Sequence, residues 1–151
     1  LTSPTRRCYD LLLKHREDIQ DMHVMLQKEV VERIAAQAGN KAYGRLSVMI
    51  QTYFKVTPLF LVPPHAFSPP PKVESAILRL IPDDTFSSQI QDHKSYESLI
   101  RQSFSQRRKT LKNNLKKLCN SDQIVAAGID PTQRAEELTV NDFLKLHAQI
   151  S

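Results

Sequence analysis

Seven basic side chains and no acidic side chain lie between residues 98 and 121 of the sequence. Like charges this close repel one another unless solvent or a bound anion screens them. A mixture of arginine and lysine suits the phosphates of a nucleic-acid backbone, because arginine binds them through a planar fork and lysine as a point charge. The alternative is an ordinary solvated helix face, but the absence of acidic partners four residues away favours nucleic acid. The candidate phosphate-binding residues are Arg101, Arg107, Arg108, Lys109, Lys112 and Lys116.

An aromatic residue, Phe67, stands two positions before three consecutive prolines, Pro69, Pro70 and Pro71. The prolines fix φ at their own positions and restrict the residues that precede them. A loop this stiff loses little entropy when it holds a ligand, and an exposed ring can stack on a nucleic-acid base for about 1–3 kcal/mol. The alternative is a loop aromatic that covers the edge of a sheet. By itself, the stretch favours the second interpretation.

The composition excludes several other classes of function. None of the three glycines falls in a G-x-G pattern, so no nucleotide-binding loop of the Walker or dinucleotide type is present. The five histidines share no spacing that would bind a metal, and no histidine lies near Ser47 or Ser75 to form a hydrolase triad. Cys8 and Cys119 are typical of free thiols in a reducing compartment, and a single disulfide between them is the less favoured alternative. Because no apolar run approaches about 18 residues and the N-terminus has no signal-peptide pattern, we expect a soluble cytoplasmic protein.

The Phe67 loop lies inside a segment, residues 1–82, whose patterns are those of an α/β unit. The last two strands are joined by a loop too short for a parallel crossover, so they should pair antiparallel, and a sheet that ends in one antiparallel strand fits this order. The final strand has apolar residues on both faces and should be largely buried. The expected elements are the end of a helix at 9–17, strands at 21–27, 57–64 and 73–82, and helices at 27–39 and 45–54.

Residues 83–151 should form a small helical domain that begins with a polar connector, and this connector is the expected domain boundary. Ser95 is the expected N-cap of a helix that ends near Phe104. The remaining signals are a short helical pattern at 121–128 and a capping-box spacing at Thr139 and Asp142.

The basic segment should be helical as well. Over residues 107–118 the leucines recur at helical spacing, and so do three cations placed four residues apart. We therefore expect one helix that turns its leucines toward the core and its cations outward, toward phosphates. The inward stripe would hold Phe104, Leu111, Leu115 and Leu118, and the outward stripe Arg108, Lys112 and Lys116.

Five stretches of the chain carry a resemblance to a known family: MLQKEVVERI (25–34), YGRLSVMIQ (43–51), VPPHAFSPPPKVESAILRL (62–80), FSQRRKTLKNNL (104–115) and GIDPTQRAEELT (128–139). Together they resemble the KsgA-type small-subunit rRNA adenine N6,N6-dimethyltransferases, over residues 10–151. The resemblance implies an α/β fold. It would be the C-terminal part of a class I (Rossmann-like) S-adenosylmethionine-dependent methyltransferase sheet, followed by a small all-helical domain that contacts rRNA. The family moves four methyl groups onto two adjacent adenosines near the 3′ end of the small-subunit rRNA.

The resemblance also implies roles for single residues. It makes Phe67 the ring that stacks on the target adenine, which such an enzyme must hold out of its helical stack. The implied partner is small-subunit rRNA or the immature small ribosomal subunit, bound by a monomer without membrane contact. The residues that match the loop around the adenine pocket are Pro69, Pro70, Pro71 and Lys72, and Lys72 is also a candidate rRNA-binding residue. The residues that match the family's basic rRNA-facing segment are Arg107, Arg108, Lys109 and Lys112.

The chain departs from the family pattern at its start. Family members carry a glycine-rich cofactor loop, an acidic residue for the ribose and an N-L-P-Y motif, and none of these is present in the 151 residues. Residues 1–8 match only loosely the stretch that follows N-L-P-Y. The family's cofactor is S-adenosylmethionine, for which we expect no binding residue here, and we expect the chain by itself not to methylate. A sheet without its N-terminal strands would also expose an unpaired edge.

Two other functions remain open. A macrolide-resistance-type methyltransferase acting on large-subunit rRNA shares the Phe67 motif, but the stretch at 128–139 and the long helical tail argue against it. A non-catalytic rRNA-binding or assembly module would use the basic segment alone. Charge reversal at Arg107, Arg108 and Lys109 would abolish binding by such a module, whereas Phe67→Ala would not.

Overall fold

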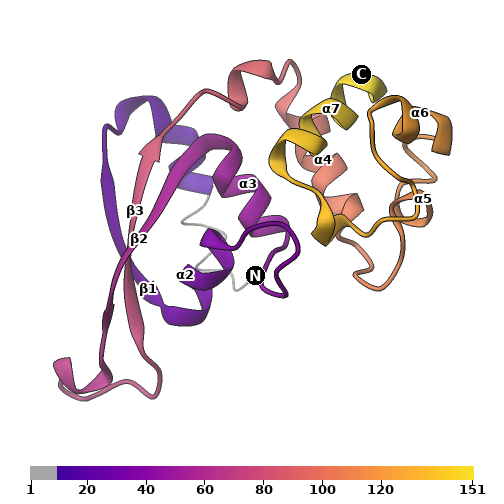
Figure 1. The fold of residues 1–151 in the computed structure, drawn as a ribbon. Coiled ribbons are helices and arrows are strands. Elements are labelled where there is room, and N and C mark those ends of the chain that lie inside the picture. Colours follow the sequence, from indigo (N-terminus) through magenta and orange to yellow (C-terminus); the bar gives the residue numbers. More distant parts are fainter. Residues whose placement is uncertain (1–9) are drawn as a thin grey trace.

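The structure of the chain is a computed structural model that describes residues 10–151. Residues 1–9 lie outside the described part, and with them Cys8 and the stretch compared with the N-L-P-Y region. Figure 1 shows a small sheet flanked by helices, and beside it a cluster that contains α4 to α7. After a helical stretch at residues 10–15, the elements (η marks a short 3-10 helix) are η1 (Arg16–Asp18), β1 (Met22–Gln27), α2 (Lys28–Ala35), α3 (Arg45–Tyr53), β2 (Phe54–Val62), η2 (Pro64–Ala66), β3 (Ser75–Pro82), η3 (Ser87–Gln89), α4 (His93–Ser103), α5 (Leu111–Asn114), α6 (Ser121–Ala126), η4 (Ala135–Glu137) and α7 (Val140–Ile150).

The three strands form one sheet in the order β1–β3–β2. β3 lies in the middle and pairs antiparallel with both neighbours, so the predicted antiparallel pairing of the last two strands is confirmed. β1 and β2 therefore run in the same direction, and α2 and α3 form the crossover between them. The register shifts between Pro58 and Phe60 of β2, since proline has no N–H to give to the ladder. Because β1 and β2 end at the same edge, the Phe67 loop begins where both strands stop.

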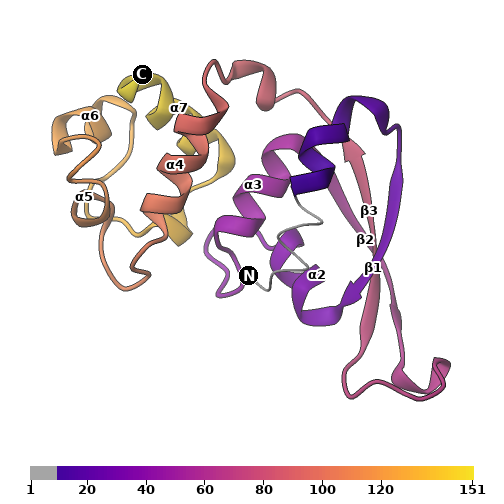
Figure 2. The same ribbon diagram turned by 180° about the vertical axis from the view of Figure 1, so that it is seen from behind.

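Helices cover only one face of this sheet. In Figures 1 and 2 the helices of the first part lie to one side of the strands. Burial along β3 alternates accordingly: Ala76, Leu78 and Leu80 are buried, and the residues between them are only partly covered. The expectation of a strand largely buried on both faces is therefore wrong for the face that carries Ile77. That face has no second layer in the described part of the chain, and Met25, paired with Ile77, is 50% exposed.

α3 lies between the sheet and the helical cluster. Seven of its nine residues are buried, because it contacts β2 on one side and α4 and α7 on the other. The segment is rich in β-branched residues and is nevertheless helical, as the spacing of its apolar residues predicted. Burial on both sides is consistent with its apolar content. The hydroxyl of Thr52 donates to the carbonyl of Val48 at 2.6 Å and lies 2.9 Å from the hydroxyl of Tyr96 in α4. The buried hydroxyls thus have partners inside the interface.

The N-cap of α4 is Asp92 and not, as predicted, Ser95. The Asp92 carboxylate accepts hydrogen bonds from the amides of Lys94 and Ser95 at 3.1 and 3.2 Å. Aspartate caps a helix as well as serine does, and its charge interacts favourably with the helix dipole. Ser95 lies instead in the first turn, where its hydroxyl is 2.7 Å from Nε2 of His147 in α7.

The single helix expected at 107–118 is not formed. The residues before Leu111 make turns, and only Leu111–Asn114 is helical. The amides that would continue a longer helix have acceptors from a distant loop: Leu111 donates to the carbonyl of Gln133 at 2.8 Å and Lys112 to that of Pro131 at 3.1 Å. These contacts explain why the expected helix does not form, because they replace the helical hydrogen bonds that the local spacing predicted.

Because the long helix is absent, the predicted apolar stripe and the predicted cationic stripe of this segment also differ from expectation. Leu111 and Leu115 are fully buried as expected, but Leu118 is 40% exposed. The outward stripe of cations does not exist as a helical feature. Its members occupy three local structures, with Arg108 in the preceding turn, Lys112 in α5 and Lys116 in the turn that follows.

The end of the chain follows the local signals closely. The Thr139 hydroxyl accepts from the amide of Asp142 at 3.2 Å, and the Asp142 carboxylate accepts from the amide of Thr139 at 3.0 Å, so the predicted capping box is confirmed. α6 ends at Ala126, and Gly128 beyond it has a φ of 81°, which glycine adopts without strain. Among residues 10–151, no helix is long and apolar enough to cross a membrane.

Candidate nucleic-acid interface

The loop between β2 and β3 projects beyond the end of the sheet, away from the helical cluster (Figure 1). Its first residues form η2, and the Phe67 amide donates to the carbonyl of Pro64 at 3.2 Å. Phe67 is partly exposed, and the three prolines after it lie on the surface. Phe67 is neither part of the hydrophobic core nor packed against it. This position weakens the interpretation of Phe67 as a plug of the sheet edge, and its stacking role stays a prediction.

A cavity of about 630 Å³ lies beside this loop. Its walls come from the end of β1, the start of α2 and the last residues of the loop, and the amide of Lys28 joins them by donating to the carbonyl of Glu74 at 2.9 Å. Lys72 lines the cavity, but so do three carboxylates. In open α/β sheets ligands bind outside the carboxyl ends of parallel strands, and β1 and β2 both end here. The cavity therefore lies at the edge where such sheets bind their ligands, and Phe67 is not among its lining residues.

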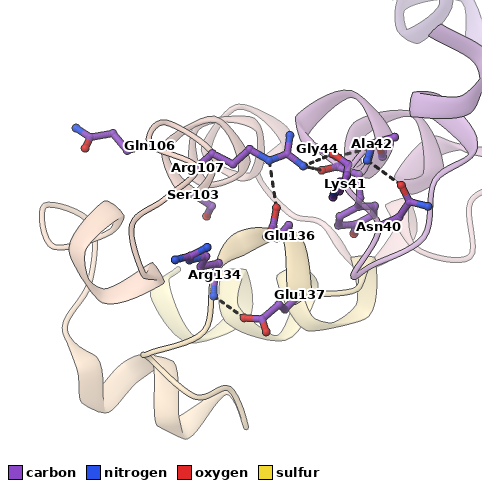
Figure 3. A network of polar contacts seen from close by, with 12 residues as sticks. Asn40, Lys41, Ala42, Gly44, Ser103, Gln106, Arg107, Arg134, Glu136 and Glu137 are labelled. Carbon is purple, nitrogen blue, oxygen red and sulfur yellow. Dashed lines mark hydrogen bonds and ion pairs between the residues drawn. The ribbon is translucent and has the colours of Figure 1, made fainter. Parts of the chain in front are cut away.

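The guanidinium of Arg107 donates hydrogen bonds to three different residues (Figure 3). Its Nε donates to Oε2 of Glu136 at 3.1 Å, and its Nη2 donates to the backbone carbonyls of Tyr43, at 2.9 Å, and of Lys41. Glu136 is 29 positions away in the sequence and the carbonyls belong to the loop between α2 and α3, so local reasoning missed all three partners. The guanidinium joins the basic segment to the α/β unit, and its predicted part in rRNA binding stays a prediction.

Two further hydrogen bonds tie the same parts together. The Tyr43 hydroxyl donates to the carbonyl of Leu138 at 2.7 Å, and the Gly39 amide donates to the carbonyl of Glu136 at 2.7 Å. Burial holds the pKa of Tyr43 well above its usual range, so the hydroxyl remains a donor at neutral pH. We call Arg107, Glu136, Tyr43 and Gly39 the Arg107 clamp.

The other predicted cations of the basic segment have no such partners. They come from the end of α4, the turn after it, α5 and the turn beyond α5, and all are exposed. Within residues 10–151 none of them is in an ion pair. Exposed cations without acidic partners are typical of a polyanion-binding surface. They are Arg101, Arg108, Lys109, Lys112 and Lys116.

The described residues offer no site that fits S-adenosylmethionine. A glycine-rich turn directly after a strand lets the backbone approach such a cofactor closely. Here Gly39 and Gly44 lie in the loop between two helices and Gly128 follows α6, so none of them follows a strand. In the same part of the chain, no group of three or more His, Cys, Asp or Glu residues could hold a metal ion.

A family model described as "Ribosomal RNA adenine dimethylase" matches residues 5–151. Curated proteins from Xanthomonas campestris pv. campestris (strain B100) and Xanthomonas oryzae pv. oryzae (strain PXO99A) are 54% and 52% identical to this chain over 134 residues. Both are named "Ribosomal RNA small subunit methyltransferase A". The matched stretch is 89% of this chain and 51% of each relative, so the chain spans about half the length of the curated relatives it matches.

Two solved structures resemble the chain in three dimensions. A dimethyladenosine transferase from Plasmodium falciparum has a TM-score of 0.76 and 28% identity, covering 93% of this chain and 62% of that one. The 23S rRNA methyltransferase ErmE has a TM-score of 0.71 and 21% identity, and the match covers 99% of this chain and 62% of that one. At this identity the likeness shows the fold alone. The predicted fold class, part of a Rossmann-like methyltransferase sheet followed by helices, is confirmed.

Proposed function

The chain belongs to the ribosomal RNA adenine dimethylase family, and on this premise we propose that it is part of an enzyme that dimethylates N6 of two adjacent adenosines near the 3′ end of small-subunit rRNA. The methyl donor is S-adenosylmethionine, and the substrate is the rRNA or the immature small subunit. The observation that carries the proposal is the position of Phe67 on a proline-stiffened loop, at the edge where β1 and β2 both end. The names of the Xanthomonas relatives support the small subunit over the large one.

In this reaction the described residues position the base. Adenine N6 is a weak nucleophile because its lone pair is delocalised into the ring, so the amino group must be held in a fixed orientation. A base that reacts in such an enzyme leaves its stack, and an aromatic face compensates for the lost stacking. Phe67 supplies that face, and Lys72 and the three prolines shape the loop that carries it. In this proposal the chain supplies one wall of the adenine pocket.

We propose that the chain has two parts with different roles, which meet at residue 82. Residues 1–82 hold the C-terminal part of the catalytic domain, and residues 83–151 bind rRNA through their exposed cations. A monomer suffices, because the base-holding loop and the cations come from one copy. The place of action is the cytoplasm, where bacterial ribosomal subunits are assembled.

A second function, rRNA binding without catalysis, is favoured for the 151-residue chain on its own. The exposed cations are present in it, and residues that fit the cofactor are not. The isolated chain should therefore bind purified small subunits and transfer no methyl groups. Methyl transfer by the isolated chain would contradict this assignment.

The role of Phe67 is tested in a chimera in which this chain replaces the matching half of the Xanthomonas campestris relative. Phe67→Ala should slow methyl transfer to immature small subunits about 5- to 150-fold, the equivalent of one lost stacking contact. Binding of the subunits should change little, because the cations are untouched. The control is Val125→Ala, which removes an exposed apolar side chain from α6 and should leave transfer unchanged. Equal transfer by the two variants would overturn the stacking role.

A further inference from the structure

The second half of β2 lacks the features that usually protect the edge of a sheet. β2 pairs with β3 on one side, and within residues 10–151 no strand pairs with its other side. Proteins protect such edges with charged residues, prolines and bulges. The first half of β2 carries Lys55 and Pro58, and the register shifts directly after Pro58. Residues 59–62 contain neither a charge nor a proline, and we call them the open edge.

The side chains of the open edge are apolar on both faces of the sheet. Phe60 pairs with Ile77 on the face without helices. Leu61 pairs with Ala76, which is buried on the helix-covered face. Leu59, Phe60 and Leu61 are nevertheless 42%, 61% and 52% exposed. The exposed side chains of β1, at the opposite edge, are two polar residues and one methionine, so the continuous apolar edge belongs to β2.

A cavity of about 570 Å³ lies between the open edge and α2. Val31 and Ala35 line it from α2, and Leu59 and Leu61 line it from β2. A strand that is added to an edge gains main-chain hydrogen bonds, and it also gains affinity where its side chains enter apolar pockets. The cavity supplies such a pocket directly beside the unpaired backbone of β2.

We propose that the open edge binds a second copy of this chain, with β2 antiparallel to β2 around a two-fold axis at Leu61. Two identical antiparallel edges complement each other, because each offers the N–H and C=O groups that the other lacks. Leu61 is the centre of residues 60–62, the regular part of β2 after the register shift. Leu61 then lies opposite Leu61 of the second copy, and Phe60 lies opposite Val62.

Charge favours this edge as the place where two copies meet. The chain has a net charge of +5, so two copies repel each other where their cations approach. The open edge is uncharged, and Figures 1 and 2 show the helical cluster, with its exposed cations, across α3 from the sheet. Two copies joined at β2 therefore keep these cations apart.

The area of the contact determines its strength. Three exposed apolar side chains and a strand edge offer roughly 500 Å² per copy, so the pair would bury about 1,000 Å² in total. This is the lower limit for a specific interface, and it predicts a reversible dimer. The inference goes beyond the proposed function and does not depend on it, because each copy carries its own Phe67 loop and its own cations.

Sedimentation equilibrium of the 151-residue chain tests the contact. Leu61→Lys should raise the dissociation constant of the dimer at least about tenfold, because it removes a buried leucine pair and places like charges opposite each other. The control is Val125→Lys in α6, which adds the same charge at a site that is 59% exposed and should change the constant by less than about twofold. Equal dissociation constants for the two variants would overturn the proposal.

A mixing experiment separates direct pairing from an effect of the substitution on folding. Leu61→Lys and Leu61→Glu should each dimerise weakly alone, whereas an equal mixture should form a heterodimer because opposite charges then face each other across the axis. A mixture that pairs no better than its components contradicts the register. An unsubstituted chain that stays monomeric at every concentration rules out the second copy. If that monomer binds a soluble peptide of alternating valine and threonine, the occupant of the edge is a strand of another protein.

Discussion

Arg107 and Arg108 are neighbours in the sequence and have different surroundings in the structure. Arg107 donates to a carboxylate and to two backbone carbonyls, whereas Arg108 is exposed and, within residues 10–151, is in no ion pair. The sequence pattern assigns both to RNA, because the partners of Arg107 lie 29 to 66 positions away. A cluster of cations therefore combines two kinds of residue, and only their contacts separate a cation held by protein groups from the exposed cations beside it.

Substituting each arginine by glutamine should show this difference. Arg107→Gln should lower the free energy of unfolding by about 1–2 kcal/mol, because one amide cannot reach all three acceptors and the half-exposed site moderates the loss. Arg108→Gln should change it by less than about 0.5 kcal/mol and instead weaken binding to small subunits. Urea unfolding and salt-dependent binding measure the two effects. Equal unfolding midpoints for the two variants would contradict the clamp.

At the scale of elements, two histidines join three helices. Nδ1 of His93 at the start of α4 lies 2.8 Å from the hydroxyl of Tyr53 in α3, and Nε2 of His147 in α7 lies 2.7 Å from the hydroxyl of Ser95. Burial lowers the pKa of both rings. The nearby Arg16 lowers that of His93 further, and Asp92 acts in the opposite direction on both. The neutral rings are therefore the forms that the packed helices favour.

A pH dependence of stability follows from these lowered pKa values. Both rings bind protons less readily in the folded state than in the unfolded chain, where the pKa is about 6.5. The free energy of unfolding should be highest above that pH and should fall as the pH drops from about 7 to 5. His147→Gln should make the fall less steep, while His65→Gln, at an exposed loop position, should not. Urea midpoints across this range test it, and stability that rises on acidification would be the opposite result.

Local signals predicted most elements well, and distant contacts account for the failures. The capping box at Thr139, the helix at α3 and the antiparallel hairpin follow from residues close together in the sequence. The basic helix failed because Gln133 and Pro131 accept the amides that it would have used. For the same reason the sequence indicated Phe67 and the exposed cations but did not reveal the partners of Arg107, which lie 29 to 66 positions away.

At the scale of the whole molecule, one hydrophobic core runs from the sheet to the last helix. The sheet itself has an open face and, within the described residues, an edge of β1 without a partner strand. Large apolar side chains lie exposed on the sheet, among them Met25 on β1 and Phe60 on β2, the latter 61% exposed. An exposed edge and apolar surface of this kind favour pairing with another chain.

The 151-residue chain should therefore associate with itself as its concentration rises. The double variant Met25→Lys, Phe60→Lys should reduce this association by placing charge on the open face. Leu118→Lys, at an exposed site in the helical part, should leave it unchanged. Sedimentation velocity over a concentration series measures the effect. A chain that stays monomeric at every concentration would show that the open face does not self-associate.

The Arg107 clamp has a consequence for how the substrate is chosen. Because it fixes the helical cluster on the loop between α2 and α3, the distance between Phe67 and the exposed cations is set by the protein and not by the RNA. Under the proposed function, an adenine would reach Phe67 only when the phosphates of a folded RNA lie at the matching distance from it. Selection of this kind depends on the shape that the ribosomal subunit has reached, so it would distinguish one stage of assembly from another without reading a base sequence.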